Sequence, residues 1–291
     1  MSLHSLLFVP ADSERKLARA ADAAADAIIL DLEDAVAEKN KPVARAMART
    51  FLQSSPAACA QIWVRINALN TPDAQLDLEG VMAGKPYGFM LPKLDHPSEV
   101  LSFGKMLTEF EVNAGVTPGA TRLMPLLETP RGILSAADYL QTDLRRLAGI
   151  TWGAQDLSAA LGIGSLRDAN GDWDFALRSA RAQCVLVARA LGIDAIETVT
   201  IEVKDPNVLR ADCVRAKAAG FSGKLAIHPD QLNVIHDVFV PSVEELDRAS
   251  RIIATFAAAA GAGAVTLDGA MIDLVHLRAA QRLLSRAGAR A

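Results

Sequence analysis

Short apolar runs alternate along the chain with longer segments of helical periodicity. Between the runs, apolar residues recur at helical spacing, as Leu17, Ala20 and Ala24 do after the first run. The runs are almost continuously apolar, which is typical of parallel strands buried on both faces of a sheet. The eight predicted strands are 6–9, 27–30, 62–66, 88–91, 123–127, 149–155, 195–203 and 224–227.

Eight strands that alternate with helices predict an α/β fold, and specifically a (β/α)8 TIM barrel. The clearest predicted helix is 175–191, which stops before Gly192. We assign residues 1–240 to the barrel as the catalytic domain. Residues 241–291 do not fit inside a closed barrel and are interpreted as a C-terminal helical lid or swapped arm. In this extension the pattern predicts a helix at 243–260, a flexible break at 261–263, an apolar run at 265–267, a turn at 268–269 and a last helix from about Leu274.

Composition narrows the class of protein. A chain of 291 residues suits one barrel with an appendage, and its net charge of −4 without a long basic run argues against nucleic acid as a partner. No apolar stretch is long enough to predict a membrane span or a signal peptide. The three cysteines (Cys59, Cys184 and Cys213) are far apart and have no metal-binding spacing, so we expect a reducing, cytoplasmic setting.

Two acidic residues stand directly after predicted strands. Glu128 follows the run 123–127, and Asp156 follows the run 149–155. Barrel enzymes carry their chemistry at the carboxyl ends of their strands, so these two carboxylates are expected to face one pocket. Two hard oxygen ligands favour Mg²⁺, which completes its shell with water or substrate oxygens. The alternative is structural, with each residue capping a helix or pairing with an arginine such as Arg131.

Other charged residues also follow strands. Arg65 ends the third strand, and its guanidinium matches a substrate carboxylate, although a surface ion pair is the alternative. Asp31, Glu33 and Asp34 follow the second strand, where one of them can cap a helix. Glu33 and Asp34 are the candidates to hydrogen-bond metal-bound water as outer-shell carboxylates.

Two further polar residues receive structural interpretations. Lys93 follows the fourth strand and could meet a phosphate or thioester oxygen, but a lone lysine there is more often solvated. His228 precedes Pro229 and is expected to be structural rather than a base. The glycines of 162–164 lack a following lysine and do not predict a phosphate loop.

Together the strand-end motifs resemble those of the citrate lyase beta-subunit-like family, within the HpcH/HpaI aldolase superfamily that includes malyl-CoA and citramalyl-CoA lyases. The resemblance covers nearly the whole chain. The motifs are LLFVP (6–10), DLEDAV (31–36), VRIN (64–67), LPK (91–93), PLLET (125–129), GAQDL (153–157) and GKLAIHP (223–229).

The resemblance implies a β/α barrel that assembles as a homotrimer or hexamer. It implies that Glu128 and Asp156 are the metal ligands and that Arg65 binds the substrate carboxylate or oxyanion. It also implies that the C-terminal lid covers a neighbouring subunit's site. The lid motif matches 271–273, which makes Asp273 the expected catalytic acid or base, with a helix cap before Leu274 as the alternative.

The implied function is reversible, Mg²⁺-dependent cleavage of a 3-hydroxyacyl-CoA, such as citramalyl-CoA or malyl-CoA, into acetyl-CoA and a 2-oxo acid. Three alternatives stay open: a citrate lyase beta subunit acting on an acyl-carrier-protein thioester, an aldolase that uses no CoA, and a catalytically silent barrel that serves in binding or assembly. The chain departs from the family pattern at Ala11, Gln155 and Glu197, and these positions bear on substrate preference.

Overall fold

The computed structural model describes residues 3–54 and 61–288, so Cys59 lies outside the described residues. The chain forms two compact units. The first runs from Leu3 to His236, and the second begins at Asp237.

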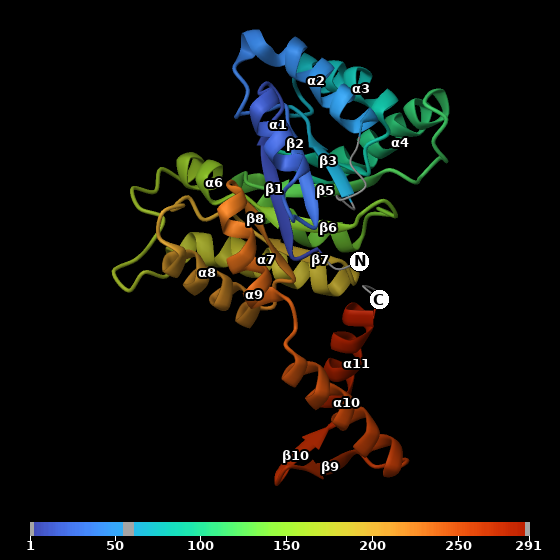
Figure 1. Cartoon of the computed structure of the whole chain (residues 1–291), viewed down its shortest axis with the longest axis vertical. Coiled ribbons are helices and arrows are strands. Elements are labelled where there is room, and N and C mark those ends of the chain that lie inside the picture. The colour runs from blue at the N-terminus through green and yellow to red at the C-terminus, as the bar shows by residue number, and fades with distance from the viewer. Residues whose placement is uncertain (1–2, 55–60, 289–291) are drawn as a thin grey trace. The chain divides into compact units, whose positions relative to one another are not determined.

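The first unit is a closed barrel of eight parallel strands in sequential order, which confirms the predicted TIM barrel (Figure 1). Parallel pairing of β1 with β8, in which Ser5 lies opposite Lys224, closes the ring. The strands are β1 (Ser5–Pro10), β2 (Ala27–Asp31), β3 (Gln61–Arg65), β4 (Gly88–Leu91), β5 (Arg122–Leu127), β6 (Gly149–Trp152), β7 (Asp194–Glu197) and β8 (Gly223–Ala226).

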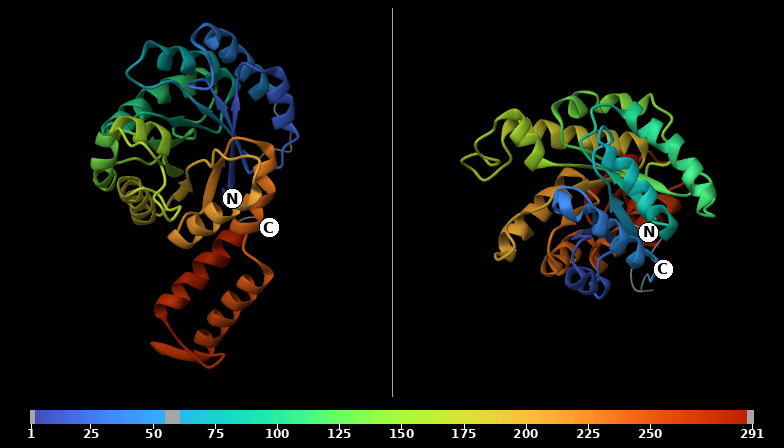
Figure 2. Two further views of the ribbon diagram at one scale, coloured as in Figure 1. Left: turned by 90° about the vertical axis from the view of Figure 1, so that its left-hand side faces the viewer. Right: turned by 90° about the horizontal axis from the view of Figure 1, so that it is seen from above.

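Helices surround these strands, as both views of Figure 2 show. The predicted helix 175–191 is confirmed as α7. The α-helices of this unit are α1 (Glu14–Ala21), α2 (Lys41–Gln53), α3 (Pro72–Val81), α4 (Pro97–Asn113), α5 (Pro130–Leu134), α6 (Ala154–Leu161), α7 (Phe175–Leu191), α8 (Pro206–Ala219) and α9 (Leu232–Phe239), which ends just past the unit. Short 3-10 helices are η1 (Glu38–Asn40), η2 (Met82–Gly84), η3 (Ala136–Leu140) and η4 (Pro229–Gln231).

Apolar side chains fill the inside of the barrel. Trp63 is fully buried in a cluster that includes Leu6, Ile29 and Leu225. A β-carbon at Gly88 would come within 2.5 Å of the Trp63 ring, so the neighbouring strand makes room for the indole by carrying no side chain there. This close packing fixes the strand ends, and with them the polar residues that follow.

Two predicted strands end earlier in the structure than the sequence pattern indicated. The seventh was expected to reach residue 203, but β7 ends at Glu197. Beyond it, the carbonyl groups of Thr198 and Thr200 accept hydrogen bonds from the side chains of Lys224 and Gln231. These β-branched residues therefore lie in irregular backbone after the strand, which two buried side chains hold in place. The sixth strand ends at Trp152 because Gly153 is the N-cap of α6.

The second unit contains two helices and a two-stranded antiparallel hairpin. Its elements are α10 (Val243–Ala258), β9 (Ala264–Leu267), β10 (Ala270–Asp273) and α11 (Leu274–Gly288). The hairpin turns at Asp268 and Gly269, which both have positive φ angles (51° and 76°), as a type I′ turn requires. Ile252, Phe256 and Ile272 form its core. Across the described parts of both units, no helix is long and apolar enough to span a bilayer.

Candidate active site

Charged residues gather at the carboxyl ends of β2 to β6, on one side of the barrel. Asp31 and Arg65 are the last residues of β2 and β3, and they lie opposite each other in the strand register. Lys93, Glu128 and Asp156 follow β4, β5 and β6. Since all strands are parallel, these ends meet at one mouth, where barrel enzymes hold their substrates.

Glu128 is buried at this mouth, at 2% exposed. Its Oε1 accepts a hydrogen bond of 2.9 Å from the backbone N–H of Lys93. A β-carbon at Gly153 would lie 2.4 Å from its Oε2 and 2.8 Å from its Cβ. The absence of a side chain at Gly153 therefore allows Glu128 to lie against the start of α6.

The surroundings of Glu128 disfavour its charged form. Burial raises the pKa of Glu128 to about 8, and the negative charges of Asp156 and Glu33 add to this, against the opposing charge of Arg65 and the Lys93 hydrogen bond. The mouth thus holds more negative charge than its own cations neutralise. A divalent cation coordinated by Glu128 and Asp156 would offset that repulsion.

Lys93 connects the acids of the mouth, although the sequence favoured a solvated lysine here. Its Nζ lies 2.8 Å from Glu33 Oε1, 3.0 Å from Asp34 Oδ1 and 3.9 Å from Asp156 Oδ1. Partial burial acts to lower the pKa of Lys93, but hydrogen bonds to Glu33 and Asp34 outweigh it and raise the pKa. Its φ of 52° is unusual for a residue with a side chain, and this conformation accompanies the hydrogen bond from its N–H to Glu128.

Arg65 is held in place by two carboxylates. Its Nε and Nη2 donate to Asp31 at 2.8 and 2.6 Å, and its Nη1 lies 2.9 Å from Glu33 Oε2. The guanidinium also lies over the Phe8 ring, 4.8 Å from the centroid. Burial would lower the pKa of Arg65, but Asp31 and Glu33 raise it, so the cation stays charged. A guanidinium has five N–H donors, and these contacts leave donors for a substrate.

The two residues predicted for outer-shell roles differ in burial. Glu33 is 4% exposed and bridges Arg65 and Lys93. Burial raises the pKa of Glu33, against the charges of Arg65 and Lys93. Asp34 is 54% exposed and contacts Lys93. Glu33 is therefore the acid that fixes both cations, and Asp34 lies at the rim.

Asp273 belongs to the second unit, at the start of α11. Its Oδ1 accepts hydrogen bonds from the backbone N–H groups of Val275 (3.0 Å) and His276 (3.3 Å), which is the helix-capping arrangement given above as the alternative. It also lies 2.7 Å from His276 Nδ1. Hydrogen bonding by His276 lowers the pKa of Asp273, so the carboxylate is ionised near neutral pH.

Sequence reasoning missed three features of the mouth. Asp31 appeared there only as one of an acidic cluster, yet it is the partner that orients Arg65. Lys93 was considered only as a solvated lysine or a contact for a phosphate or thioester oxygen, and Gly153 only as part of the GAQDL motif, yet both shape the position of Glu128. His228 was expected to be structural, and its Nδ1 accepts a hydrogen bond from the Asp230 N–H at the start of η4.

The donor set at the mouth suits a magnesium ion better than zinc. Within residues 3–54 and 61–288, no group of three or more His, Cys, Asp or Glu side chains is arranged to hold a metal. Glu128 and Asp156 would supply two carboxylate ligands, and Mg²⁺ typically takes one or two and keeps water or substrate oxygens in its other positions.

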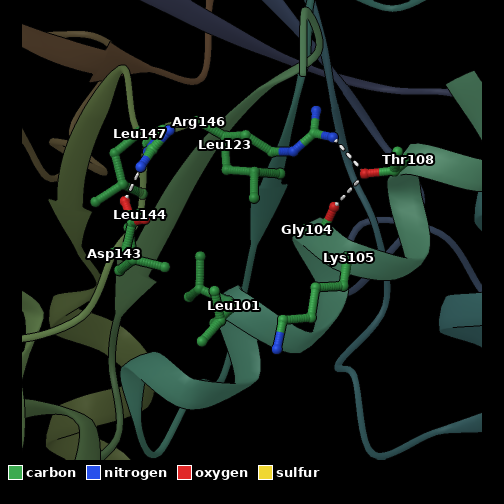
Figure 3. A pocket seen from close by; sticks show the side chains of 11 residues that line it. Leu101, Gly104, Lys105, Thr108, Leu123, Asp143, Leu144, Arg146 and Leu147 are labelled. Atoms are coloured by element: carbon green, nitrogen blue, oxygen red, sulfur yellow. Dashed lines mark hydrogen bonds and ion pairs between the residues drawn. The ribbon is translucent and has the colours of Figure 1, made fainter. Parts of the chain in front are cut away.

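Two pockets lie near strand ends. One of about 380 Å³ adjoins the carboxyl ends of β1 and β8 and includes the basic residues Arg15, Lys16 and Arg19 of α1. The other, of about 180 Å³, lies between α4 and the segment before β6 (Figure 3). Leu123, near the start of β5, lines it, so it adjoins the opposite ends of the strands. Its Arg146 is already bound to Thr108 and Glu111. The first pocket therefore belongs with the mouth, and the second does not.

Fold and mouth together define a TIM barrel whose acidic site suits an oxygen-liganded cation. The sequence model of the HpcH/HpaI aldolase/citrate lyase family matches residues 4–229. The chain belongs to this family, which confirms the resemblance drawn from its motifs.

Curated and solved relatives agree with that assignment. The chain is 37% identical to a citrate lyase subunit beta-like protein of Mycobacterium tuberculosis, over 97% of this chain and 94% of that protein. It is 34% identical to a (3S)-malyl-CoA thioesterase of Cereibacter sphaeroides, over 98% of this chain and 94% of that protein. The crystal structure of CitE from Mycobacterium tuberculosis, in complex with magnesium, acetoacetate and coenzyme A, superposes with a TM-score of 0.78 at 36% identity, covering 99% of this chain and 98% of that one.

Proposed function

We propose that this protein is a Mg²⁺-dependent carbon–carbon lyase that reversibly cleaves a 3-hydroxyacyl-CoA into acetyl-CoA and a 2-oxo acid. The observation that carries the proposal is the pairing of Glu128 and Asp156 beside Arg65 at one barrel mouth. Relatives point the same way, because CitE of Mycobacterium tuberculosis is solved with magnesium and coenzyme A.

The cofactor is Mg²⁺, held by Glu128 and Asp156. When bound, it supplies a Lewis acid that polarises the substrate's hydroxyl or carbonyl oxygen and a template for the neighbouring carboxylate. Glu128 would present its Oε2, because its Oε1 is bound to the Lys93 N–H. Lys93 and Glu33 hold the remaining charges in fixed positions around the ligands.

Arg65 would bind the part of the substrate that leaves as the 2-oxo acid. In the cleavage direction the hydroxyl loses its proton, the carbon–carbon bond breaks, and the electron pair passes to the thioester as an enolate. The Arg65 cation opposes negative charge on the oxygen that becomes the ketone or aldehyde. Asp31 and Glu33 keep its guanidinium aimed, so little reorganisation is needed during the reaction.

Asp273 would exchange the proton at the enolate carbon, from a lid that covers a neighbouring subunit's mouth in a homotrimer or hexamer. Support comes from its position in a separate unit, with an exposed carboxylate whose pKa is lowered by His276. The ionised carboxylate can remove a proton of acetyl-CoA in the synthetic direction. In cleavage it takes up, by way of water, the proton that the substrate hydroxyl releases, and it then delivers a proton to the enolate carbon.

The basic pocket beside β1 and β8 suits the phosphates of a CoA thioester. Arg15 and Lys16 lie on its α1 wall. Phosphate groups bind preferentially to such cations, and a built-in pocket of this kind favours free CoA over an acyl-carrier protein as the thioester carrier.

The test is Mg²⁺-dependent release of a 2-oxo acid from malyl-CoA, citramalyl-CoA and methylmalyl-CoA, by the parent and by Glu128→Gln and Asp156→Asn. Each variant should lose turnover on the order of a hundredfold or more, because each removes a charged ligand from the reacting centre. Glu109→Gln makes the same carboxylate-to-amide change at an exposed position of α4, away from the mouth, and serves as the control. Full activity after treatment with EDTA would contradict the proposal.

A second candidate is hydrolysis of the thioester, favoured by the 34% identical malyl-CoA thioesterase. A thiol reagent that detects free CoA separates the two reactions. Cleavage alone leaves acetyl-CoA intact and releases no thiol, whereas hydrolysis releases one thiol for each substrate consumed.

A further inference from the structure

A basic pocket of about 280 Å³ lies away from the mouth, between the barrel wall and helices α7 and α8. Its β7 and β8 lining residues, Glu197 and Lys224, are register neighbours, while Ile196 and Leu225 beside them belong to the barrel interior. Since side chains alternate along a strand, Glu197 and Lys224 point outward to the helices. Five basic residues line the pocket against three acidic ones, in a chain of net charge −4: Arg167, Arg178, Arg181, Arg215 and Lys224 against Asp172, Glu197 and Asp212.

The two buried acids of the pocket are already neutralised. Both carboxylate oxygens of Asp212 accept hydrogen bonds of 2.9 Å from Arg167 Nη2. Glu197 accepts from Arg181 Nε at 2.6 Å and from the Trp152 indole at 2.7 Å. These two acids are therefore already engaged, and the other cations of the pocket are Lys224, Arg178 and Arg215.

Lys224 is the most unusual of those cations, because its side chain is completely buried. In the described part of the chain, its ammonium makes one hydrogen bond, of 2.5 Å, to the Thr198 carbonyl. An ammonium has three donors, so two are left. Burial lowers the pKa of Lys224, while the charges of Glu197 and Asp212 act to raise it. Lys224 lines the pocket, so an anion there would lie beside this buried charge and offset it.

Two arginines at the rim are held loosely. The side chains of Arg178 and Arg215 are 54% and 47% exposed. Arg178 lies 3.9 Å from Asp168, and Arg215 lies 3.7 Å from Asp172 and 3.5 Å from Asp212. Such distances leave both guanidinium groups able to turn toward a ligand above Lys224.

We propose that this pocket binds a phosphate dianion, free or as the phosphate monoester of a small metabolite. Lys224 would contact the anion from the floor, and Arg178 and Arg215 would close on it from the rim. The volume exceeds that of one phosphate group, which leaves room for an ester substituent. None of these residues belongs to the mouth, so the site is independent of the proposed lyase reaction.

The experiment is calorimetric titration of the full chain, in EDTA without Mg²⁺, with inorganic phosphate and with glycerol 3-phosphate, at constant ionic strength set by chloride. Phosphate should bind with 1:1 stoichiometry. Lys224→Met should weaken binding by about tenfold or more, since a hydrogen bond between charged groups contributes that much. Equal affinity for glycerol 3-phosphate would identify a monoester site, and its failure to bind would identify a site for free phosphate.

Two further variants separate this pocket from its alternatives. If Lys224→Met does not fold, the surface double variant Arg178→Gln/Arg215→Gln should show the same loss, because both side chains are exposed at the rim. Lys105→Gln/Arg145→Gln removes two basic charges from the pocket between α4 and the segment before β6 and should leave phosphate binding unchanged. The proposal would be overturned if the Arg178/Arg215 variant still bound phosphate as the parent does. It would also be overturned if the parent bound phosphate no better than it binds chloride.

Discussion

The position of Glu128 depends on the missing side chain of Gly153. A β-carbon there would approach Oε2 of Glu128 to 2.4 Å. Gly153→Ala should therefore displace Glu128 and weaken Mg²⁺ binding by about 10- to 100-fold, the usual effect of disturbing a ligand's support. Calorimetry with Mg²⁺ measures this. Gly164→Ala is a matched control, because a β-carbon at Gly164 meets nothing within 4 Å. Equal affinity in the two variants would show that Glu128 is not a ligand.

Protonation of Glu128 should couple to metal binding. Its pKa is raised from the usual 4.5 to about 8 by burial and by the charges of Asp156 and Glu33. A raised pKa means that the folded, metal-free protein holds a proton which the unfolded chain has released. This contribution to stability is complete below pH 4.5 and is lost as the pH rises to about 8. A cation binds the ionised carboxylate, so it must displace that proton.

We therefore expect Mg²⁺ binding at pH 7 to release about one proton. Calorimetric titrations in buffers of different ionisation enthalpy give that number directly. The proton release should vanish at pH 9. At pH 7, Glu128→Asp keeps a carboxylate and should still release a proton on binding Mg²⁺, whereas Glu128→Gln should not. Binding without proton release at pH 7 would show that Glu128 is ionised before the metal arrives.

Sequence reasoning reached some of these residues and not others, for a physical reason. Glu128, Asp156 and Arg65 were found because parallel strands bring their carboxyl ends to one mouth, and the pattern gives the strand ends. The partners of Arg65 and Lys93 could not be found that way. An ion pair depends on the geometry of side chains from different strands, and the acidic cluster offered several equivalent candidates.

At the scale of elements, α4 is fastened to the barrel by a buried ion pair. Glu111 is completely buried, and its two oxygens lie 2.7 and 2.8 Å from Nη1 and Nη2 of Arg146. It also accepts from the backbone N–H groups of Gly119 and Thr121. These contacts hold the end of α4 against the start of β5 and the segment before β6.

Removing that acid should destabilise the protein strongly. Glu111→Ala should lower the free energy of unfolding by about 3–5 kcal/mol, because it leaves the Arg146 charge enclosed without its partner. Urea denaturation followed by circular dichroism measures the difference. Glu109→Ala, at an exposed position of the same helix, should stay within about 0.5 kcal/mol of the parent. A similar small change at both positions would contradict this view of the α4 anchor.

Element boundaries show what periodicity can and cannot predict. Helix α7 matched its predicted bounds because Gly192 ends it with a left-handed backbone, at φ of 70°. The seventh strand was predicted too long, because the β-branched residues after Glu197 suit a strand but lie in irregular backbone. The backbone after Glu197 is held by hydrogen bonds from the side chains of Lys224 and Gln231, which belong to other elements. Such contacts cannot be predicted from the local sequence pattern.

For the whole molecule, the proposed lid predicts that active sites are shared between subunits. Glu128→Gln and Asp273→Asn should each be inactive alone. After subunit exchange in a mixture, some mouths with an intact Glu128 should meet a lid with an intact Asp273, and lyase activity should return. Activity assays before and after exchange measure this, and Glu128→Gln mixed with Asp156→Asn is the control that should stay inactive. No recovery in exchanged oligomers would place Asp273 outside the reaction or confine it to its own subunit's site.

Closure of the barrel by β1 and β8 sets an order for folding during synthesis. Ser5 pairs with a strand that begins more than two hundred residues later in the chain. Until β8 leaves the ribosome, β1 has one open edge with unpaired N–H and C=O groups, beside a mostly apolar interior. Nascent chains halted before residue 223 are thus expected to expose an unpaired strand edge and to bind chaperones. Once β8 is made, it pairs with β1 and no strand edge of the barrel stays open.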